Sequence, residues 1–173
     1  MLFRSRNKPV VCAVNGLAVG GGFEIAMAAE FVLAADHAQF FLPETSLGII
    51  PDVGAIRLPR MLPPVVANEV LFGGRRLDAM EAERWGLVNR VVPASDLRDA
   101  ALELAGRIAA AAPLAVEAVM AIDRATRQLS TDEAFVHLRS GDLEAYGRML
   151  TSEDAQEGPR AFTEKRDPHW QGR

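Results

Sequence analysis

The sequence is poor in cysteine, tyrosine and lysine, and has no excess of positive charge. Its 173 residues include one cysteine, Cys12, and one tyrosine, and the net charge is −4. A single cysteine cannot form an internal disulfide or a cysteine-rich zinc site, so we predict a reduced thiol in a cytoplasmic protein. The charge balance excludes nucleic acid or an anionic membrane as the main partner.

Long hydrophobic runs are also missing. The longest uncharged stretch, residues 9–23, contains four glycines and is shorter than the roughly 18 residues of a membrane helix. The basic residues before the apolar run 10–14 imitate a secretory signal. That run breaks at Asn15 and Gly16, below the roughly 7–15 apolar residues such a signal requires. We therefore predict no membrane segment.

The first third of the chain alternates strand and helix patterns, which is typical of an α/β fold. Residues 10–14 form a β-branched run between Pro9 and Asn15, which predicts a fully buried central strand. Strong helix formers follow Gly20 to Gly22 and predict a helix over 23–30. Two short strands are predicted over 31–35 and 39–42.

The second half is predicted to be mainly helical. Ser130 and Glu133 have the spacing of a capping box, which marks a helix start. We predict an α/β core over residues 1–92 and a helical region over 93–173. The other predicted elements are a loop over 43–52, short helices over 55–61, 65–72 and 80–85, a strand over 87–92, and helices over 96–112, 114–128, 131–146 and 152–165.

Two acids stand alone in apolar surroundings. Glu24 is the only charged residue between positions 9 and 29, and Glu44 is the only one between 39 and 51. An ionised carboxylate is costly in such surroundings unless it is paired or hydrogen-bonded, so the two are a candidate acid/base couple. The alternative is structural: Glu24 caps its helix or points to solvent, and Glu44 is a turn residue after Pro43.

Gly20, Gly21 and Gly22 directly precede Glu24. Three glycines at a helix start suggest that something approaches the backbone closely, and the free N–H groups there favour developing negative charge, as in an oxyanion hole. A phosphate cradle is disfavoured because the run matches neither a dinucleotide fingerprint nor a P-loop. Close packing of the helix on a strand remains an alternative.

Other reactive side chains indicate little chemistry. His37, His137 and His169 are far apart without metal-ligand spacing, so no metal site is predicted. Ser46 lies outside any nucleophile-elbow pattern, which disfavours covalent catalysis.

Several motifs resemble the enoyl-CoA hydratase/isomerase (crotonase) family, and the similarity covers nearly the whole chain. They are Lys8-Pro9-Val10, Asn15-Gly16, Gly20-Gly21-Gly22-Phe23-Glu24, Phe41-Leu42-Pro43-Glu44, Leu47-Gly48-Ile49-Ile50-Pro51, Gly74-Arg75-Arg76, Trp85-Gly86-Leu87-Val88 and Glu164-Lys165-Arg166. Within the family, Leu58-Pro59-Arg60, Arg139-Ser140-Gly141 and Asp167-Pro168 are most similar to members acting on crotonobetainyl-CoA and carnitinyl-CoA.

The resemblance implies a crotonase-like spiral of ββα units whose helical tail, residues 93–173, serves trimerisation and covers the site, with trimers commonly pairing into hexamers. It implies a lyase that adds water to, or removes it from, the C2–C3 bond of a CoA thioester. Gly21 matches an oxyanion-hole glycine, and Glu24 and Glu44 match the two catalytic glutamates. No metal or separate cofactor is implied, because the substrate itself carries CoA.

Two departures from the family pattern matter. The stretch 51–57 is one residue short and lacks paired glycines, and Asp52 stands where many members have glycine. Asp52 could attract a trimethylammonium group or simply cap a helix. The chain also starts just before the family's catalytic core, so we expect weak activity from it alone. A straight-chain enoyl-CoA hydratase, an isomerase and a noncatalytic assembly module remain alternatives.

Overall fold

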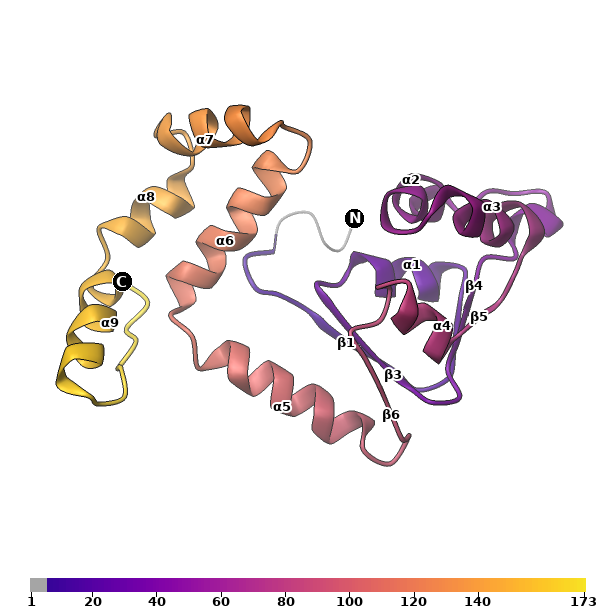
Figure 1. Cartoon of the computed structure of the whole chain (residues 1–173), viewed down its shortest axis with the longest axis horizontal. Helices are drawn as coiled ribbons and strands as arrows, with labels where there is room; N and C mark the ends of the chain where they lie inside the picture. The colour runs from indigo at the N-terminus through magenta and orange to yellow at the C-terminus, as the bar shows by residue number, and fades with distance from the viewer. Residues whose placement is uncertain (1–5) are drawn as a thin grey trace. The chain divides into compact units, whose positions relative to one another are not determined.

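Strands and helices alternate through the first part of the chain, as the sequence predicts. The protein is represented by a computed structural model that describes residues 6–173 (Figure 1). Its chain forms two units, an α/β unit, Pro9–Ala105, and a helical unit, Gly106–Arg173.

The α/β unit contains two small sheets. Within the described part of the chain, each sheet has three strands, in the orders β1-β3-β6 and β2-β4-β5. All neighbours pair in parallel except β4 and β5, which are antiparallel. The strands are β1 Val11–Val14, β2 Leu17–Val19, β3 Phe31–Ala35, β4 Gln39–Phe41, β5 Leu77–Asp78 and β6 Arg90–Val92. The strands β1 and β2, and then β3 and β4, enter different sheets before a helix follows, which is the predicted ββα repeat.

The helices of this unit cover the sheets and one another. In Figure 1, α2 and α3 lie next to each other beyond α1, and α1 packs against β2 and α2. Prolines separate α2 from α3, as predicted from Pro63 and Pro64. The elements are α1 Gly21–Ala28, the short 3₁₀ helix η1 Glu44–Leu47, α2 Asp52–Met61, α3 Pro64–Gly73, α4 Ala79–Arg84 and α5 Leu97–Ala109, of which the part from Gly106 onward is assigned to the helical unit.

Large apolar side chains fill the space between these elements. Phe23 of α1 and Phe40 of β4 are each 1% exposed, and their ring centroids are 5.4 Å apart. Burying one such side chain contributes roughly 1.5–3 kcal/mol. In a second apolar cluster, Leu97 and Leu104 of α5 pack against Leu33 of β3. The core thus fixes α1 and β4, the two elements that lead into Glu24 and Glu44.

The helical unit consists of α6 Pro113–Thr126, α7 Thr131–Arg139, α8 Glu144–Leu150 and α9 Glu153–Glu164. The capping box at the start of α7 is confirmed. The prediction of a single helix over 131–146 is wrong, because the helix is interrupted between α7 and α8. Gly141 adopts a φ of 87° there, a conformation that continues no right-handed helix.

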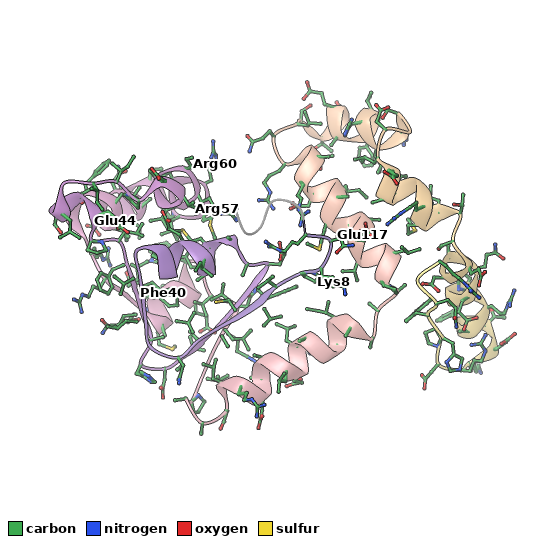
Figure 2. All side chains as sticks on the ribbon, turned by 180° about the vertical axis from the view of Figure 1, so that it is seen from behind. Lys8, Phe40, Glu44, Arg57, Arg60 and Glu117 are labelled. Carbon is green, nitrogen blue, oxygen red and sulfur yellow. The ribbon has the colours of Figure 1, made fainter. Side chains whose placement is uncertain are left out.

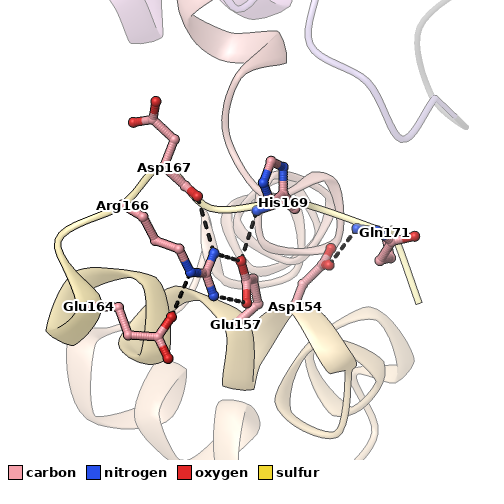
Figure 3. Close-up of polar contacts among 7 residues, drawn as sticks. All are labelled: Asp154, Glu157, Glu164, Arg166, Asp167, His169 and Gln171. Atoms are coloured by element: carbon pink, nitrogen blue, oxygen red, sulfur yellow. Dashed lines mark hydrogen bonds and ion pairs between the residues drawn. The ribbon is translucent and has the colours of Figure 1, made fainter.

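The C-terminal segment after α9 folds back onto that helix (Figure 3). Glu157 accepts two hydrogen bonds from Arg166, at 2.5 and 2.9 Å, and one from the His169 N–H at 2.9 Å. Asp154 is 4% exposed and accepts hydrogen bonds from the N–H groups of Gln171 and Gly172. These contacts, the "tail clamp" of Asp154, Glu157 and Arg166, hold the last residues in place.

The structure also corrects two other predictions and adds two strands. The strand at 10–14 is not fully buried: β1 pairs with β3 at the edge of its sheet within the described residues, and Ala13 is exposed. The short strands β2 and β5 were not predicted from the sequence. The predicted loop over 43–52 contains η1 and the first residue of α2.

No single helix among residues 6–173 is long and apolar enough to cross a membrane. In this part of the chain, only α5 and α6 taken together have the length and apolar composition of a membrane span, and they are bent by 100° relative to each other.

Candidate active site

The N-terminal turn of α1 is the centre of the candidate site. Gly20 precedes the helix with a φ of 52° and donates its N–H to the Phe41 carbonyl at 3.0 Å. The first hydrogen bond of the helix runs from the Glu24 N–H to the Gly20 carbonyl at 3.0 Å. Gly21 is exposed and is the first residue of α1. Its N–H is therefore one of the donors at a helix start that have no acceptor within the helix. Such donors suit a developing oxyanion.

Glu24 lies one turn further along α1 and is half-buried. Its Oε1 atom accepts hydrogen bonds from the N–H groups of Val53 and Gly54, both at 2.9 Å. These donors belong to the first turn of α2, so Glu24 caps a neighbouring helix rather than its own. Within residues 6–173, Oε2 of Glu24 has no hydrogen-bond partner. The Glu24 carboxylate is thus fixed to the start of α2 through one of its two oxygen atoms.

Glu44 is the first residue of η1, on the turn that leads from β4 toward α2 (Figure 2). Its carbonyl accepts the Ile49 N–H at 3.1 Å, and the neighbouring Thr45 hydroxyl donates to the Leu71 carbonyl at 3.1 Å. The Oε2 atom of Glu44 is buried and has no hydrogen-bond partner among the described residues. Buried polar atoms are normally paired, so this oxygen calls for a partner that a ligand can supply.

Gly20 connects Glu44 with α1. A Cβ atom built on Gly20 would lie 2.5 Å from Oε1 of Glu44. The Glu44 carboxylate therefore lies directly against the residue that precedes Gly21. The sequence indicated that something approaches these glycines closely, and at Gly20 that group is a carboxylate of the protein itself.

Asp52 is exposed and is the first residue of α2. The interpretation of Asp52 as the helix cap is wrong: Pro51 occupies the N-cap position, no side chain of that position caps the helix, and Glu24 binds the free N–H groups instead. Asp52 directly precedes Val53, a residue bound by Glu24. Its role in substrate choice stays a prediction.

The structure thus arranges Gly21, Glu24 and Glu44 around the start of α1, with Asp52 beside the Glu24 contact. The shared cavity and a bound C2–C3 unit between the carboxylates stay predictions. The sequence analysis missed Gly20 as a neighbour of Glu44 and Gly54 as a donor to Glu24. The glycine run indicated a close approach at Gly20, whereas no local pattern in the sequence marks Gly54 as a donor to Glu24.

The other reactive residues form no comparable cluster. Among residues 6–173, no group of three His, Cys, Asp or Glu side chains could hold a metal ion. His37 contacts Asp36 at 3.3 Å and the Asn15 carbonyl at 3.1 Å on the surface. Burial raises the pKa of the Cys12 thiol, which makes the reactive thiolate scarcer.

The α/β fold with its glycine-rich helix start is shared with known proteins, and comparison with them identifies the family. The model of the enoyl-CoA hydratase/isomerase family matches residues 1–173. The chain is 56% identical over 167 residues to carnitinyl-CoA dehydratase of Salmonella arizonae, covering 96% of this chain and 64% of that protein. The carnitinyl-CoA dehydratase of Proteus mirabilis is also 56% identical, over 168 residues, with the same coverage.

Solved structures agree. A crystal structure of enoyl-CoA hydratase from Bacillus anthracis matches with a TM-score of 0.91 at 36% identity, over 99% of this chain and 66% of that one. Enoyl-CoA hydratase from Mycobacterium tuberculosis matches with a TM-score of 0.90 at 37% identity, over 98% and 66%. The chain belongs to the enoyl-CoA hydratase/isomerase family and has the crotonase fold, and it spans 64% of the length of the curated relatives it matches.

Proposed function

We propose that this protein adds water to, or removes it from, the C2–C3 bond of an acyl-CoA thioester. The observation that carries this proposal is the pair of carboxylates around the start of α1. Glu24 is held through Oε1 by two N–H groups, and Glu44 lies against Gly20 with a buried, unpaired Oε2. Two acids on either side of a reacting unit can move a proton and activate water in one site.

The chemistry follows from these positions. The Gly21 N–H donates a hydrogen bond to the thioester oxygen, which stabilises the enolate that forms when water adds at C3 in hydration or when C2 loses a proton in dehydration. One carboxylate transfers the proton at C2, while the other removes a proton from the water that attacks C3, or returns it in dehydration. Removing one oxyanion donor typically costs about 10²–10³ in rate, and removing an acid or base costs about 10²–10⁴.

We further propose crotonobetainyl-CoA and carnitinyl-CoA as the substrates. The relatives at 56% identity carry the name carnitinyl-CoA dehydratase. Asp52 is exposed beside the Glu24 contact, where its negative charge could attract the trimethylammonium group of these acyl chains. A straight-chain enoyl-CoA hydratase is the second candidate, favoured by the solved enoyl-CoA hydratases of the same fold.

The remaining assignments belong to the same proposal. Residues 93–173 would serve trimerisation, in a homotrimer or a hexamer, and cover the site. We place the protein in the cytoplasm because of its single cysteine, Cys12. The reaction as proposed uses no metal and no cofactor beyond the CoA that the substrate carries.

The test is turnover by the purified protein, followed by the loss of enoyl-CoA absorbance with crotonobetainyl-CoA and crotonyl-CoA. We expect hydration of both thioesters and a higher rate with crotonobetainyl-CoA than with crotonyl-CoA. In an Asp52→Asn variant the preference should fall, and an unchanged ratio would remove Asp52 from substrate choice. A protein that melts cooperatively but hydrates neither thioester would contradict the proposal and favour an assembly module. Double-bond migration without hydration would favour an isomerase.

A further inference from the structure

We infer that Gly20 is a positioning residue for Glu44. Its missing side chain creates the space in which the Glu44 carboxylate lies against the start of α1. This inference rests on the proposed function for its effect on rate, while its geometric content concerns the two residues alone.

The contact itself is the first argument. A Cβ on residue 20 would lie 2.5 Å from Oε1 and 3.5 Å from Cδ of Glu44. A separation of 2.5 Å is far below an ordinary van der Waals contact, so any side chain at this position must push the carboxylate away. By contrast, apart from chain neighbours and the backbone of α1 itself, no heavy atom of the described residues would lie within 4 Å of a Cβ on Gly21 or Gly22.

The backbone gives the second argument. Gly20 has φ 52° and ψ −121°, a combination essentially restricted to glycine. Its N–H is bound to the Phe41 carbonyl at 3.0 Å, and Phe41 lies three residues before Glu44. Gly20 is therefore fixed to the segment that carries the carboxylate.

The fixed backbone of Glu44 is the third argument. The Glu44 carbonyl binds the Ile49 N–H, and Thr45 is anchored to the Leu71 carbonyl. Because the η1 backbone is held on both sides, a clash at residue 20 would be relieved by rotation of the Glu44 side chain. That rotation would move the carboxylate away from Gly20 and so from the start of α1, where the substrate is proposed to bind.

The first experiment measures stability and does not depend on activity. Gly20→Ala, Glu44→Ala and the double variant are melted alongside the unmodified protein. We expect Gly20→Ala to lower Tm, and to lower it less when Glu44 is already alanine, because the clash has been removed. Equal Tm losses in both backgrounds would overturn the inference. If Gly20→Ala alone does not fold, recovery of a cooperative transition in the double variant supports the inference, and continued failure overturns it.

Gly74→Ala is the matched control for backbone strain. Gly74 also has a positive φ, 62°, and the nearest atom to its Cβ position is the Leu42 carbonyl oxygen at 4.0 Å. This substitution should lower Tm without coupling to Glu44→Ala. Coupling of the same size at Gly74 would show that the effect is general strain and would overturn the inference.

The second experiment measures kcat and KM with crotonobetainyl-CoA. A misplacement of about 1 Å can cost about 10²-fold in rate, so Gly20→Ala should lower kcat by about 10- to 10²-fold with little change in KM. The loss should nearly vanish in a Glu44→Gln background, because both changes act through one carboxylate. Independent, multiplying losses in kcat would overturn the inference. Full turnover by Glu44→Gln alone would instead refute the proposed function, while the melting cycle still decides the position of Glu44.

Discussion

The α/β unit and the helical unit are each stabilised by a different kind of contact. Among residues 6–173, most buried hydrophobic side chains belong to the α/β unit, including Phe23, Phe40 and Leu42, whereas the helical unit contributes Ala118, Met120 and Ala161. The helical unit relies more on polar contacts, above all the tail clamp of Asp154, Glu157 and Arg166.

Both units keep large apolar side chains on their surfaces. Val65 and Phe72 of α3 are 73% and 74% exposed, and Val119, Val136 and Phe162 of the helical unit are 66%, 72% and 87% exposed. Exposed apolar surface commonly marks a site of protein contact. The two units therefore differ in their cores rather than in their surfaces: a large apolar core surrounds the elements that carry the candidate catalytic groups, whereas few buried apolar side chains belong to the helical unit.

The largest expected effect is on catalysis. Glu24→Gln and Glu44→Gln should each lower kcat by about 10²–10⁴, because the amide cannot exchange the proton. Glu144→Gln, the same change at an exposed position of α8, should leave kcat unchanged. Steady-state kinetics with crotonobetainyl-CoA checks all three. Full activity of Glu24→Gln or Glu44→Gln would remove that residue from the mechanism.

The contrast in packing predicts the next effect. Phe40→Ala should lower the free energy of unfolding by about 3–5 kcal/mol, because it removes a side chain that is 1% exposed and leaves a cavity. Phe135→Ala in α7, where the side chain is 52% exposed, should stay within about 0.5 kcal/mol. Chemical denaturation measures both. Similar losses would contradict the difference between the units.

Asp154→Ala tests how much the polar contacts of the tail clamp stabilise the helical unit. Asp154 is buried, and its loss leaves the N–H groups of Gln171 and Gly172 without their acceptor. Hydrogen bonds to charged groups contribute about 1.5–3 kcal/mol, so we expect a loss of stability in that range. Hydrogen exchange should show faster exchange at these two amides. Unchanged protection there would show that Asp154 does not hold the tail.

The smallest effect is a pH dependence from Glu157. The Arg166 guanidinium, followed by the His169 N–H, lowers the pKa of Glu157 from 4.5 to about 2. A depressed carboxyl pKa stabilises the folded state above pH 4.5, and this contribution is lost as the pH falls from 4.5 toward 2. The difference in Tm between the unmodified protein and Glu157→Gln should therefore be largest at neutral pH and shrink over this range. A constant difference would contradict the ion-pair account.

Local signals in the sequence predicted the features that depend on neighbouring residues. The strands at 31–35 and 39–42, the helix after the glycine run and the capping box of Ser130 and Glu133 all follow from short-range patterns, and the structure confirms them. The family resemblance is confirmed as well.

The features that escaped prediction depend on contacts between distant residues. Glu24 meets Val53 and Gly54 about thirty positions away, and no spacing in the sequence encodes that pairing. The edge position of β1 depends on which strands pair with it. The break at Gly141 is an exception because its cause is local: Gly141 has a φ of 87°, between two segments whose sequence patterns are both helical.

The most direct test of the central claim is a crystal structure of the protein with the saturated analogue of crotonobetainyl-CoA, which keeps the thioester carbonyl but has no double bond to hydrate. We predict that the carbonyl oxygen of the analogue accepts the Gly21 N–H, and that the carboxylates of Glu24 and Glu44 lie on either side of its C2–C3 unit. Carboxylates too far apart to reach the same C2–C3 unit, or an acyl group bound away from the start of α1, would contradict the account.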